Sequence, residues 1–336
     1  MSAPAVIDVL QLQRYPVPGF HSVERLFDDV RSVLAGSAVQ VRVRINRYPS
    51  HGLWPRLRDA WAARAARAEV KHVTGDVHYL AWFLQRSRTV LTVLDCVGLN
   101  RLSGWRRALF KWLWYSIPVR RARVITVISE FTRRELLAET GIDPERVRVI
   151  YPHLSEEFRP LPQTPSAGPL RLLQIGTAPN KNIERLAAAL AGLDVELTVI
   201  GALRDSQRAA LEQAGIRFVE RVDLDRAQVL AAYAHCDLVC FVSTYEGFGL
   251  PIIEAQAVGR PVLTSLACSM PEVAGDAACL VDPRDVASIR AGVQRLIADA
   301  DYRCHLVELG YRNVERFRLR RIAGQYADLY REVAQT

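Results

Sequence analysis

The sequence predicts an α/β protein of two doubly wound domains, each a parallel sheet with helices on both faces. Three observations predict this class. The chain has 336 residues, which is long for one such domain and enough for two that each bury a core. In both halves, short apolar runs rich in β-branched residues alternate with segments of helical periodicity. Between the two sets, residues 160–169 are rich in proline and glycine.

The apolar runs give the expected strands in chain order. In the first half they cover residues 5–12, 39–45, 70–74, 90–94 and 124–127. In the second half they cover residues 170–175, 195–200, 216–218, 238–242, 261–264 and 278–281. Because parallel strands need long crossover connections, the segments between these runs are expected to be helices.

The segment 160–169 is expected to be a linker, since its prolines and glycine suit neither a helix nor a central strand. We therefore predict a first domain over residues 1–160 and a second over 161–318. A C-terminal helix over 319–336 can pack back on the first domain. A ligand cleft is expected between the two sheets.

Composition indicates a globular protein, with 50% hydrophobic and 24% charged residues. We expect a cytoplasmic location for two further reasons. No stretch approaches the roughly 20 apolar residues of a membrane-spanning helix, and the start of the chain does not resemble a signal peptide. The six cysteines lack metal-ligand spacing, so we expect reduced thiols and no metal site.

The net charge of +8 is unevenly distributed. Residues 1–160 hold 25 Lys and Arg against 15 Asp and Glu, whereas the remainder holds 19 against 21. This asymmetry predicts an anionic partner for the first half: a membrane surface, a phosphorylated acceptor or a nucleic acid. A merely solvated basic face is an equal alternative.

The most informative stretch is residues 238–259, which read LVCFVSTYEGFGLPIIEAQAVG. A buried strand is expected to end near Ser243, and Pro251 then stands in the first turn of a helix. Gly247 and Gly249 allow the backbone to approach a ligand closely. The N–H groups at a helix start bind phosphate oxygens, and here we expect them to be those of Phe248, Gly249 and Leu250.

Two glutamates, Glu246 and Glu254, flank this turn. Carboxylates beside a phosphate would repel it unless hydroxyl groups engage them, and sugar and ribose hydroxyls suit this purpose. The alternative is an ordinary strand-to-helix turn with a capping glutamate and a surface glutamate. That alternative does not call for the glycines, the proline and both acids together.

With these residues in place, the sequence resembles retaining glycosyltransferase family four, the glycosyltransferases group 1. The family signature E-G-F-G-L-P-x-x-E-A stands intact at residues 246–255. The likeness continues through residues 259–265 and 270–277, and in the first half through 124–132 and 147–150. It implies the GT-B fold, in which two Rossmann-like domains face a cleft. It also implies transfer of a sugar with retention and without an obligatory metal ion or other cofactor.

A second motif, residues 172–185, has the pattern of a strand, a glycine turn at Gly176 and a helix start, with Lys181 in the loop. Alone, such a lysine is more often solvated than catalytic. Joined to the first motif in a family-like order, Lys181 is expected at the departing diphosphate, whose growing negative charge it stabilises. Thr177 and Asn180 stand where the family often has an arginine.

The resemblance also assigns roles to the donor-site residues. It implies that Glu246 holds the sugar and Glu254 the ribose, while the amides of residues 248–250 bind the diphosphate. Residues 218–224 resemble the strand and loop beside the nucleotide base, which places Val222 and Asp223 near it. An ordinary loop is an equal alternative there.

In the first half, residues 72–79 close a strand with a glycine turn, which predicts that Thr74, Asp76 and His78 face the cleft. A structural role is an equal alternative for the histidines. The next strand ends at Asp95, a candidate for orienting the acceptor or the sugar. Leu94 stands before it, where relatives commonly have a histidine.

Residues 102–123 combine aromatic and basic side chains. Apolar residues cover more than one face of the expected helix, so it is either buried on most sides or lies against lipid. We favour burial. Lipid contact would place the protein at the inner face of the membrane, with a lipid-linked acceptor.

The expected function is transfer of a sugar from a UDP- or GDP-linked donor to a glycan or lipid-linked acceptor, in cell-surface polysaccharide synthesis. A sugar-nucleotide epimerase or a phosphorylase would share the two sheets but lack this turn between two glutamates. The alternative from another class is a non-catalytic nucleotide-sugar or polyanion binding protein of the same fold. No nucleic-acid-binding motif is found, so no nucleic acid partner is expected.

Overall fold

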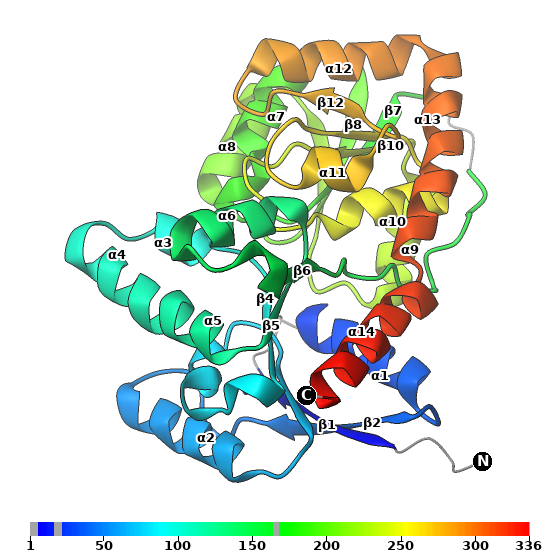
Figure 1. The fold of residues 1–336 in the computed structure, drawn as a ribbon. Coiled ribbons are helices and arrows are strands. Elements are labelled where there is room, and N and C mark those ends of the chain that lie inside the picture. The colour runs from blue at the N-terminus through cyan, green and yellow to red at the C-terminus, as the bar shows by residue number, and fades with distance from the viewer. Residues whose placement is uncertain (1–5, 17–21, 164–167, 336) are drawn as a thin grey trace. The chain divides into compact units, whose positions relative to one another are not determined.

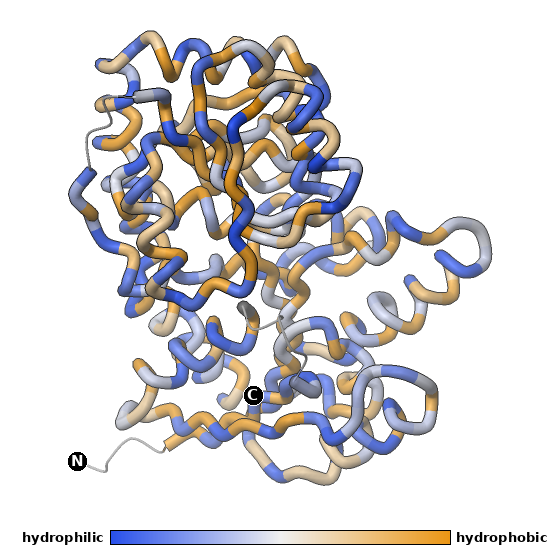
Figure 2. Tube along the Cα trace, turned by 180° about the vertical axis from the view of Figure 1, so that it is seen from behind, coloured by the Kyte–Doolittle hydropathy of each residue, from blue (hydrophilic) through white to orange (hydrophobic). Residues whose placement is uncertain are grey.

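The computed structural model describes residues 6–16, 22–163 and 168–335. The chain forms two compact units, Met1–His153 with Arg318–Thr336, and Leu154–Phe317 (Figure 1). Figure 2 shows that many of the sheet strands are hydrophobic segments. In the part of the chain that is described, no helix combines the length and the apolar character that crossing a bilayer requires.

The sheet of the first unit has six parallel strands in the order β2-β1-β3-β4-β5-β6. Five of them match the predicted runs to within a residue or two, although residue 5 of the first run lies outside the described part. The sixth strand was not predicted, because it has three residues. The strands are β1 (Ile7–Gln13), β2 (Val39–Ile45), β3 (Val70–Val73), β4 (Thr89–Val93), β5 (Val124–Val127) and β6 (Val147–Val149).

Alternate strand residues divide between two cores in this unit. Val9, Val70 and Val90 pack under α1 (Ser22–Leu34) and α14 (Leu319–Ala334). Leu10, Val73 and Leu91 lie in the core on the opposite face. This alternation follows from the two-residue period of a strand. The elements of that second core are α2 (Leu53–Ala65), η1 (His78–Phe83), α5 (Ile117–Arg121) and α6 (Glu130–Thr140).

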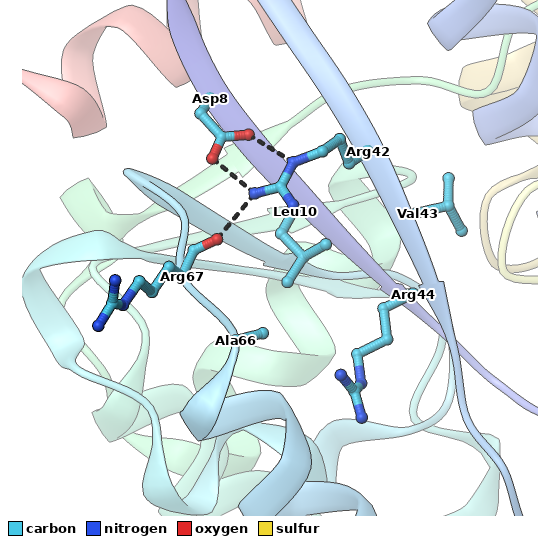
Figure 3. Close-up of a pocket in the computed structure, with 7 residues that line it drawn as sticks. All are labelled: Asp8, Leu10, Arg42, Val43, Arg44, Ala66 and Arg67. Carbon is cyan, nitrogen blue, oxygen red and sulfur yellow. Dashed lines mark hydrogen bonds and ion pairs between the residues drawn. The ribbon is translucent and has the colours of Figure 1, made fainter.

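At the edge of this sheet, β2 carries arginines that disfavour pairing with another strand. Arg42 donates to both carboxylate oxygens of Asp8, at 2.8 and 2.6 Å, and to the carbonyl oxygen of Arg67 at 2.8 Å. These residues line a pocket of about 430 Å³ together with Arg44 (Figure 3). Part of the basic excess of the first half therefore lies at this edge, where Arg42 is already paired.

The last helix, α14, packs on the first unit although it follows the second unit in sequence. Its Tyr330 hydroxyl lies 2.8 Å from Nδ1 of His72 on β3, and Nε2 of His72 lies 2.7 Å from the hydroxyl of Thr92 on β4. Gln11 on β1 also donates to Tyr330, at 3.1 Å. Three strands are thus tied to the helix through one buried polar network.

The sheet of the second unit also has six parallel strands, in the order β12-β11-β10-β7-β8-β9. All six correspond to predicted runs. The order reverses between β7 and β10, which creates a topological switch point at their carboxyl ends, where ligands bind in open α/β sheets. The strands are β7 (Leu170–Ile175), β8 (Val195–Ile200), β9 (Arg217–Arg221), β10 (Leu238–Phe241), β11 (Val262–Ser265) and β12 (Cys279–Val281).

Helices cover this second sheet. On one face of the sheet, the strands share a single core with α7 (Ile183–Leu190), α8 (Asp205–Gln213) and α12 (Val286–Ala298). The other main helices are α9 (Arg226–His235), α10 (Leu250–Val258), α11 (Met270–Ala274) and α13 (Ala300–Asn313).

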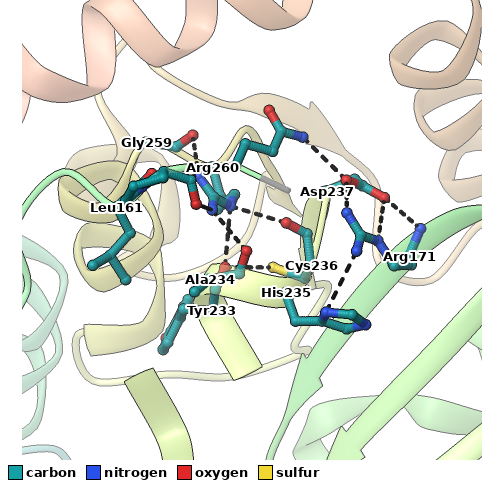
Figure 4. A network of polar contacts seen from close by, with 11 residues as sticks. Leu161, Arg171, Tyr233, Ala234, His235, Cys236, Asp237, Gly259 and Arg260 are labelled. Atoms are coloured by element: carbon teal, nitrogen blue, oxygen red, sulfur yellow. Dashed lines mark hydrogen bonds and ion pairs between the residues drawn. The ribbon is translucent and has the colours of Figure 1, made fainter. Parts of the chain in front are cut away.

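The boundary between the units lies at residues 153 and 154, earlier than the predicted boundary at 160. The physical reason is Arg260, a 2% exposed side chain whose guanidinium donates to the carbonyl oxygens of Leu161 and Pro162 (Figure 4). The same guanidinium donates to the carbonyl oxygens of Tyr233 and Cys236 near the end of α9. Residues 160–163 therefore belong to the second unit, and residues 164–167 of the predicted linker lie outside the described part.

The His72 network predicts an acid-sensitive first unit. Burial lowers the pKa of His72 from 6.5 to about 3, so between these values the unfolded chain binds a proton that the folded chain does not. Stability should therefore fall as the pH drops from 6.5 toward 3, by at most ~1.4 kcal/mol per pH unit from this group. Urea unfolding of the wild type and of His72→Gln at pH values across this range measures how the free energy of unfolding depends on pH. Equal slopes in the two proteins would contradict the assignment.

Candidate functional site

The turn after β10 has the predicted form. Gly249, with φ 107°, precedes the first residue of α10, and Pro251 occupies the first turn of that helix. A Cβ atom on Gly249 would lie 3.1 Å from Cδ1 of Ile252, and an L side chain is strained at this φ. Phe248 is buried and packs edge-on against Phe317. The start of α10 is thus held in a fixed place at the carboxyl end of β10.

Side-chain hydroxyls from β11 and the loop after it hold the backbone of this turn. They donate to carbonyl oxygens at the end of β10 and in the turn after it, and so give these backbone groups hydrogen-bond partners. The pairs are Thr264 to Phe241 at 2.8 Å, Ser265 to Ser243 at 2.6 Å, and Ser269 to Glu246 at 2.9 Å and to Phe248 at 2.8 Å.

Lys181 and Glu246, predicted from separate motifs, form an ion pair. Nζ of Lys181 donates to Oε1 of Glu246 at 2.6 Å, and the two side chains are 17% and 16% exposed. Asn180 donates to the same oxygen at 3.1 Å and to the carbonyl oxygen of Tyr245 at 2.9 Å. The ammonium also lies 4.4 Å from the ring centroid of Phe241. The loop after β7 and the turn after β10 therefore meet at the switch point.

Gly176 is the reason that Lys181 can take this path. It has φ 84°, and a Cβ atom there would lie 2.9 Å from Cε of Lys181. The lysine side chain therefore runs over the glycine backbone. Next in the loop, Asn182 has φ 62° and donates to the carbonyl oxygens of Val242 and Pro283, at 3.0 and 2.7 Å. These contacts fix where the ammonium lies.

Glu254, the second predicted glutamate, has a separate set of partners on α9. The buried Tyr233 hydroxyl donates to its Oε2 at 2.7 Å, and Nη1 of Arg226 lies 4.0 Å from its Oε1. Burial raises the pKa of Glu254, and the contacts with Tyr233 and Arg226 oppose that rise. Glu246 is thus paired with a cation, whereas Glu254 is oriented mainly by a phenol.

Val222 and Asp223 follow β9 at the carboxyl edge of the same sheet. Val222 is 48% exposed, and Asp223 has φ 53°, which is unusual for a residue other than glycine. The structure therefore places both residues in an accessible loop before α9.

In the first unit, the expectation that Thr74, Asp76 and His78 face a cleft is wrong for two of the three. Thr74 is 2% exposed and donates to the carbonyl oxygen of Leu12. His78 is 3% exposed, and its Nδ1 donates to the carbonyl oxygen of Trp114 at 2.9 Å. Asp76 is exposed, with its Oδ1 3.6 Å from Nη1 of Arg14.

The role of His78 comes from a π-helical turn, η3 (Trp112–Ser116). Such a turn disturbs the regular pairing of helix carbonyls. Trp82 donates from Nε1 to the carbonyl oxygen of Leu113 at 2.9 Å, beside the contact of His78 with Trp114. His78 is therefore a support for this turn, and burial lowers its pKa.

Asp95 lies at the carboxyl end of β4, before the short helix α3 (Val97–Asn100). Its Oδ1 accepts from the backbone N–H of Val97 at 3.0 Å, and its carbonyl oxygen accepts from the Tyr115 hydroxyl at 3.2 Å. The side chain is partly exposed, so it can still meet a ligand.

The aromatic basic segment is not buried on most sides as expected. It forms α4 (Gly104–Lys111), η3 and α5, and the second core of the first unit includes Tyr115, with Phe110 and Trp114 packed against it. Besides η1, the segment contacts α6, where Glu139 pairs with Arg107 and Lys111. Its exposed apolar residues are Trp105, Leu109 and Trp112, at 71%, 46% and 53% exposed.

Several residues that contact the predicted glutamates were not among the expected site residues. Asn180 was noted only as the position of a family arginine, Ser269 stands next to the family-like run at 270–277, and Tyr233 carries no local signal in the sequence. Their contacts span 66, 23 and 21 residues, which sequence spacing does not reveal.

Comparison with known protein families assigns each unit to a glycosyltransferase model. The model described as Glycosyltransferase Family 4 matches residues 16–157, and the model described as Glycosyl transferases group 1 matches residues 169–299. The two matches fall on the two units in turn.

Two curated relatives are mannosyltransferases. The chain is 29% identical over 308 residues to the O-antigen chain mannosyltransferase B of Escherichia coli, covering 83% of this chain and 78% of that protein. It is 28% identical over 246 residues to the MMP alpha-(1->4)-mannosyltransferase of Mycolicibacterium hassiacum, covering 67% of this chain and 59% of that protein.

Among solved structures, Anabaena HepE in complex with UDP and glucose superposes with a TM-score of 0.77. The match covers 97% of this chain and 100% of that chain, at 18% identity. The two-sheet architecture is therefore the GT-B fold.

The packing of Lys181 over Gly176 predicts a coupling between the two residues. Gly176→Ala should cost about 1 kcal/mol from the positive φ, and a further amount because the new methyl group displaces Lys181 from Glu246. In a Lys181→Ala background only the first cost should remain. Free energies of unfolding of the four proteins measure the difference.

The matched control is Gly215→Ala, since Gly215 has φ 66° and open space around an added Cβ atom. It should cost the same with or without Lys181. A cost of Gly176→Ala that does not depend on residue 181 would show that the two side chains do not interact in this way.

Proposed function

The chain belongs to glycosyltransferase family 4, the glycosyltransferases group 1, and we propose that it moves a sugar from a nucleoside diphosphate sugar to a hydroxyl group of a glycan or lipid-linked acceptor. We further propose that the anomeric configuration is retained and that the product is a cell-surface polysaccharide. The observation that carries the proposal is the meeting of Lys181 and Glu246 beside the start of α10, at the switch point of the second sheet.

The site supplies positive charge and amide donors where a diphosphate would leave. Breaking the bond between the sugar and the phosphate builds negative charge on the departing group. The ammonium of Lys181 and the N–H groups of residues 248–250 would stabilise that charge. Because these groups provide the stabilisation, we propose that no metal ion is required. In a retaining transfer of this kind, the acceptor proton can pass to the departing phosphate, so no protein base is assigned.

The two glutamates suit the hydroxyl groups of such a donor. Glu246 would accept from the sugar, and Glu254, oriented by Tyr233, would accept from the ribose. Val222 and Asp223 would lie beside the base. In the first unit, Asp76 and Asp95 are the candidates for orienting the acceptor, whereas the buried His78 contacts η3.

The names of the relatives indicate which donor sugars and which nucleotide bases to test first. The mannosyltransferases favour mannose as the sugar, and the HepE complex supports a uridine nucleotide as one candidate base. GDP-mannose and UDP-glucose are therefore the first two donors to examine.

We also propose a peripheral contact with an anionic membrane surface. Trp105, Leu109 and Trp112 expose an apolar face on α4 and η3. Exposed arginines at positions 101, 106, 120 and 121 adjoin it in sequence. Aromatic residues at the headgroup level and flanking positive charges are the features that hold a helix at a membrane surface. Such a contact would bring a lipid-linked acceptor to the first unit.

The proposed function predicts that Glu246→Ala lowers turnover by about 10²- to 10³-fold, the usual cost of removing a group that stabilises the transition state. The assay is release of nucleoside diphosphate from GDP-mannose or UDP-glucose, with an alkyl mannoside as acceptor, with and without EDTA. The control is Asp194→Asn, an equal change of charge on an exposed residue at the opposite end of the sheet.

A polyanion-binding protein would behave differently. It would show no acceptor-dependent release, and its salt-sensitive binding would survive Glu246→Ala. Turnover that is lost on addition of EDTA would instead contradict the proposed independence from metal ions.

The proposed membrane contact predicts that the double variant Trp105→Ser with Trp112→Ser loses most of its binding to vesicles that contain phosphatidylglycerol, because the apolar part of the contact is removed. Co-sedimentation with vesicles measures it. The control is Trp54→Ser, another exposed tryptophan of the first unit, at 74%. The assignment would be refuted if the wild type did not bind anionic vesicles, or if both variants lost the same fraction of that binding.

A further inference from the structure

We propose that Glu246 competes with the diphosphate for the ammonium group of Lys181, and that the sugar of the donor ends this competition by occupying the Glu246 carboxylate. The consequence is a site that binds the sugar-carrying donor in preference to the free nucleoside diphosphate. The inference rests on the proposed function, because it assumes that both ligands bind at this turn.

The competition follows from the contact itself. In the structure, Lys181, the cation that the second motif places at the turn, already donates to Glu246 at 2.6 Å, and Asn180 donates to the same oxygen. Both partners are about one-sixth exposed, so solvent screens the pair less than it would at the surface. A charge-assisted hydrogen bond of this length is strong. A diphosphate can therefore bind Lys181 fully only if the hydrogen bond from Lys181 to Glu246 breaks.

The surroundings of Lys181 limit its freedom to serve both partners at full strength. Its methylene groups run over Gly176, and its ammonium faces the ring of Phe241 at 4.4 Å. These contacts direct the ammonium toward Glu246. The carboxylate in turn lies on the turn whose amides would bind the phosphates, so it repels them while it stays charged and unoccupied.

The donor and the product differ in what they offer to Glu246. The sugar of the donor carries hydroxyl groups that can donate to the carboxylate and replace the hydrogen bond from Lys181. The nucleoside diphosphate has no sugar at that position, so its arrival would leave Glu246 partly desolvated without a donor. Once the sugar has been transferred, the ion pair between Lys181 and Glu246 forms again. The nucleoside diphosphate then dissociates more easily.

The test uses Glu246→Gln, which keeps the shape of the side chain and removes its charge. Isothermal titration at low ionic strength measures two pairs of probes, GDP with GDP-mannose and UDP with UDP-glucose. We expect the variant to bind the nucleoside diphosphate about tenfold more tightly than the wild type, because Lys181 is released. The matching donor should show no such gain, so the preference for donor over product shrinks.

Two further variants separate the ion pair from a simple change of charge. In Lys181→Met, adding Glu246→Gln should give little of that gain, since no ammonium is left to release. Asp194→Asn, an equal change of charge at a distant exposed residue, should leave both affinities unchanged.

An unchanged or weaker affinity of Glu246→Gln for the nucleoside diphosphate would overturn the inference, and so would an equal gain in the Lys181→Met background. In either case the proposed function would stand if the wild type binds the donor. Wild-type protein that binds no probe of either pair would overturn the proposed function and the inference together.

Discussion

The ion pair between Lys181 and Glu246 is the contact on which the rest of the candidate site depends. It joins two loops from the central strands β7 and β10, at the point where the strand order reverses. Neither side chain is placed by its own loop alone. Gly176 gives the lysine room, and Ser269 holds the backbone of the turn that carries the glutamate. The sheet topology thus brings together Lys181 and Glu246, which belong to two separate sequence motifs, at one end of the sheet.

The two glutamates differ in a way that fits two different tasks. Glu254 receives its hydrogen bond from Tyr233, a fully buried phenol in α9, and this contact favours one orientation of the carboxylate. Glu246 is held by a lysine and an asparagine from a loop, and a ligand that offers new donors can replace these contacts. One carboxylate is therefore suited to hold a constant group such as ribose. The other is suited to respond to the group being transferred.

Much of the fold could be predicted from the sequence, because buried parallel strands are short apolar runs, and a three-residue strand such as β6 was too short to detect. Lys181 and Glu246 were found from local motifs, but their contact joins residues 65 apart. The burial of His78 was not predicted, because its partner, the Trp114 carbonyl, belongs to a π-helical turn that has no local signature in the sequence. The aromatic segment was predicted wrongly because a count of apolar residues does not say which face is packed.

The most direct test of this account is a crystal structure of the protein with GDP-mannose or UDP-glucose bound. We expect the diphosphate at the start of α10 within hydrogen-bonding distance of Lys181, with Glu246 turned to the sugar and Glu254 to the ribose. A nucleotide bound elsewhere, with Lys181 and Glu246 still paired and the turn empty, would contradict it.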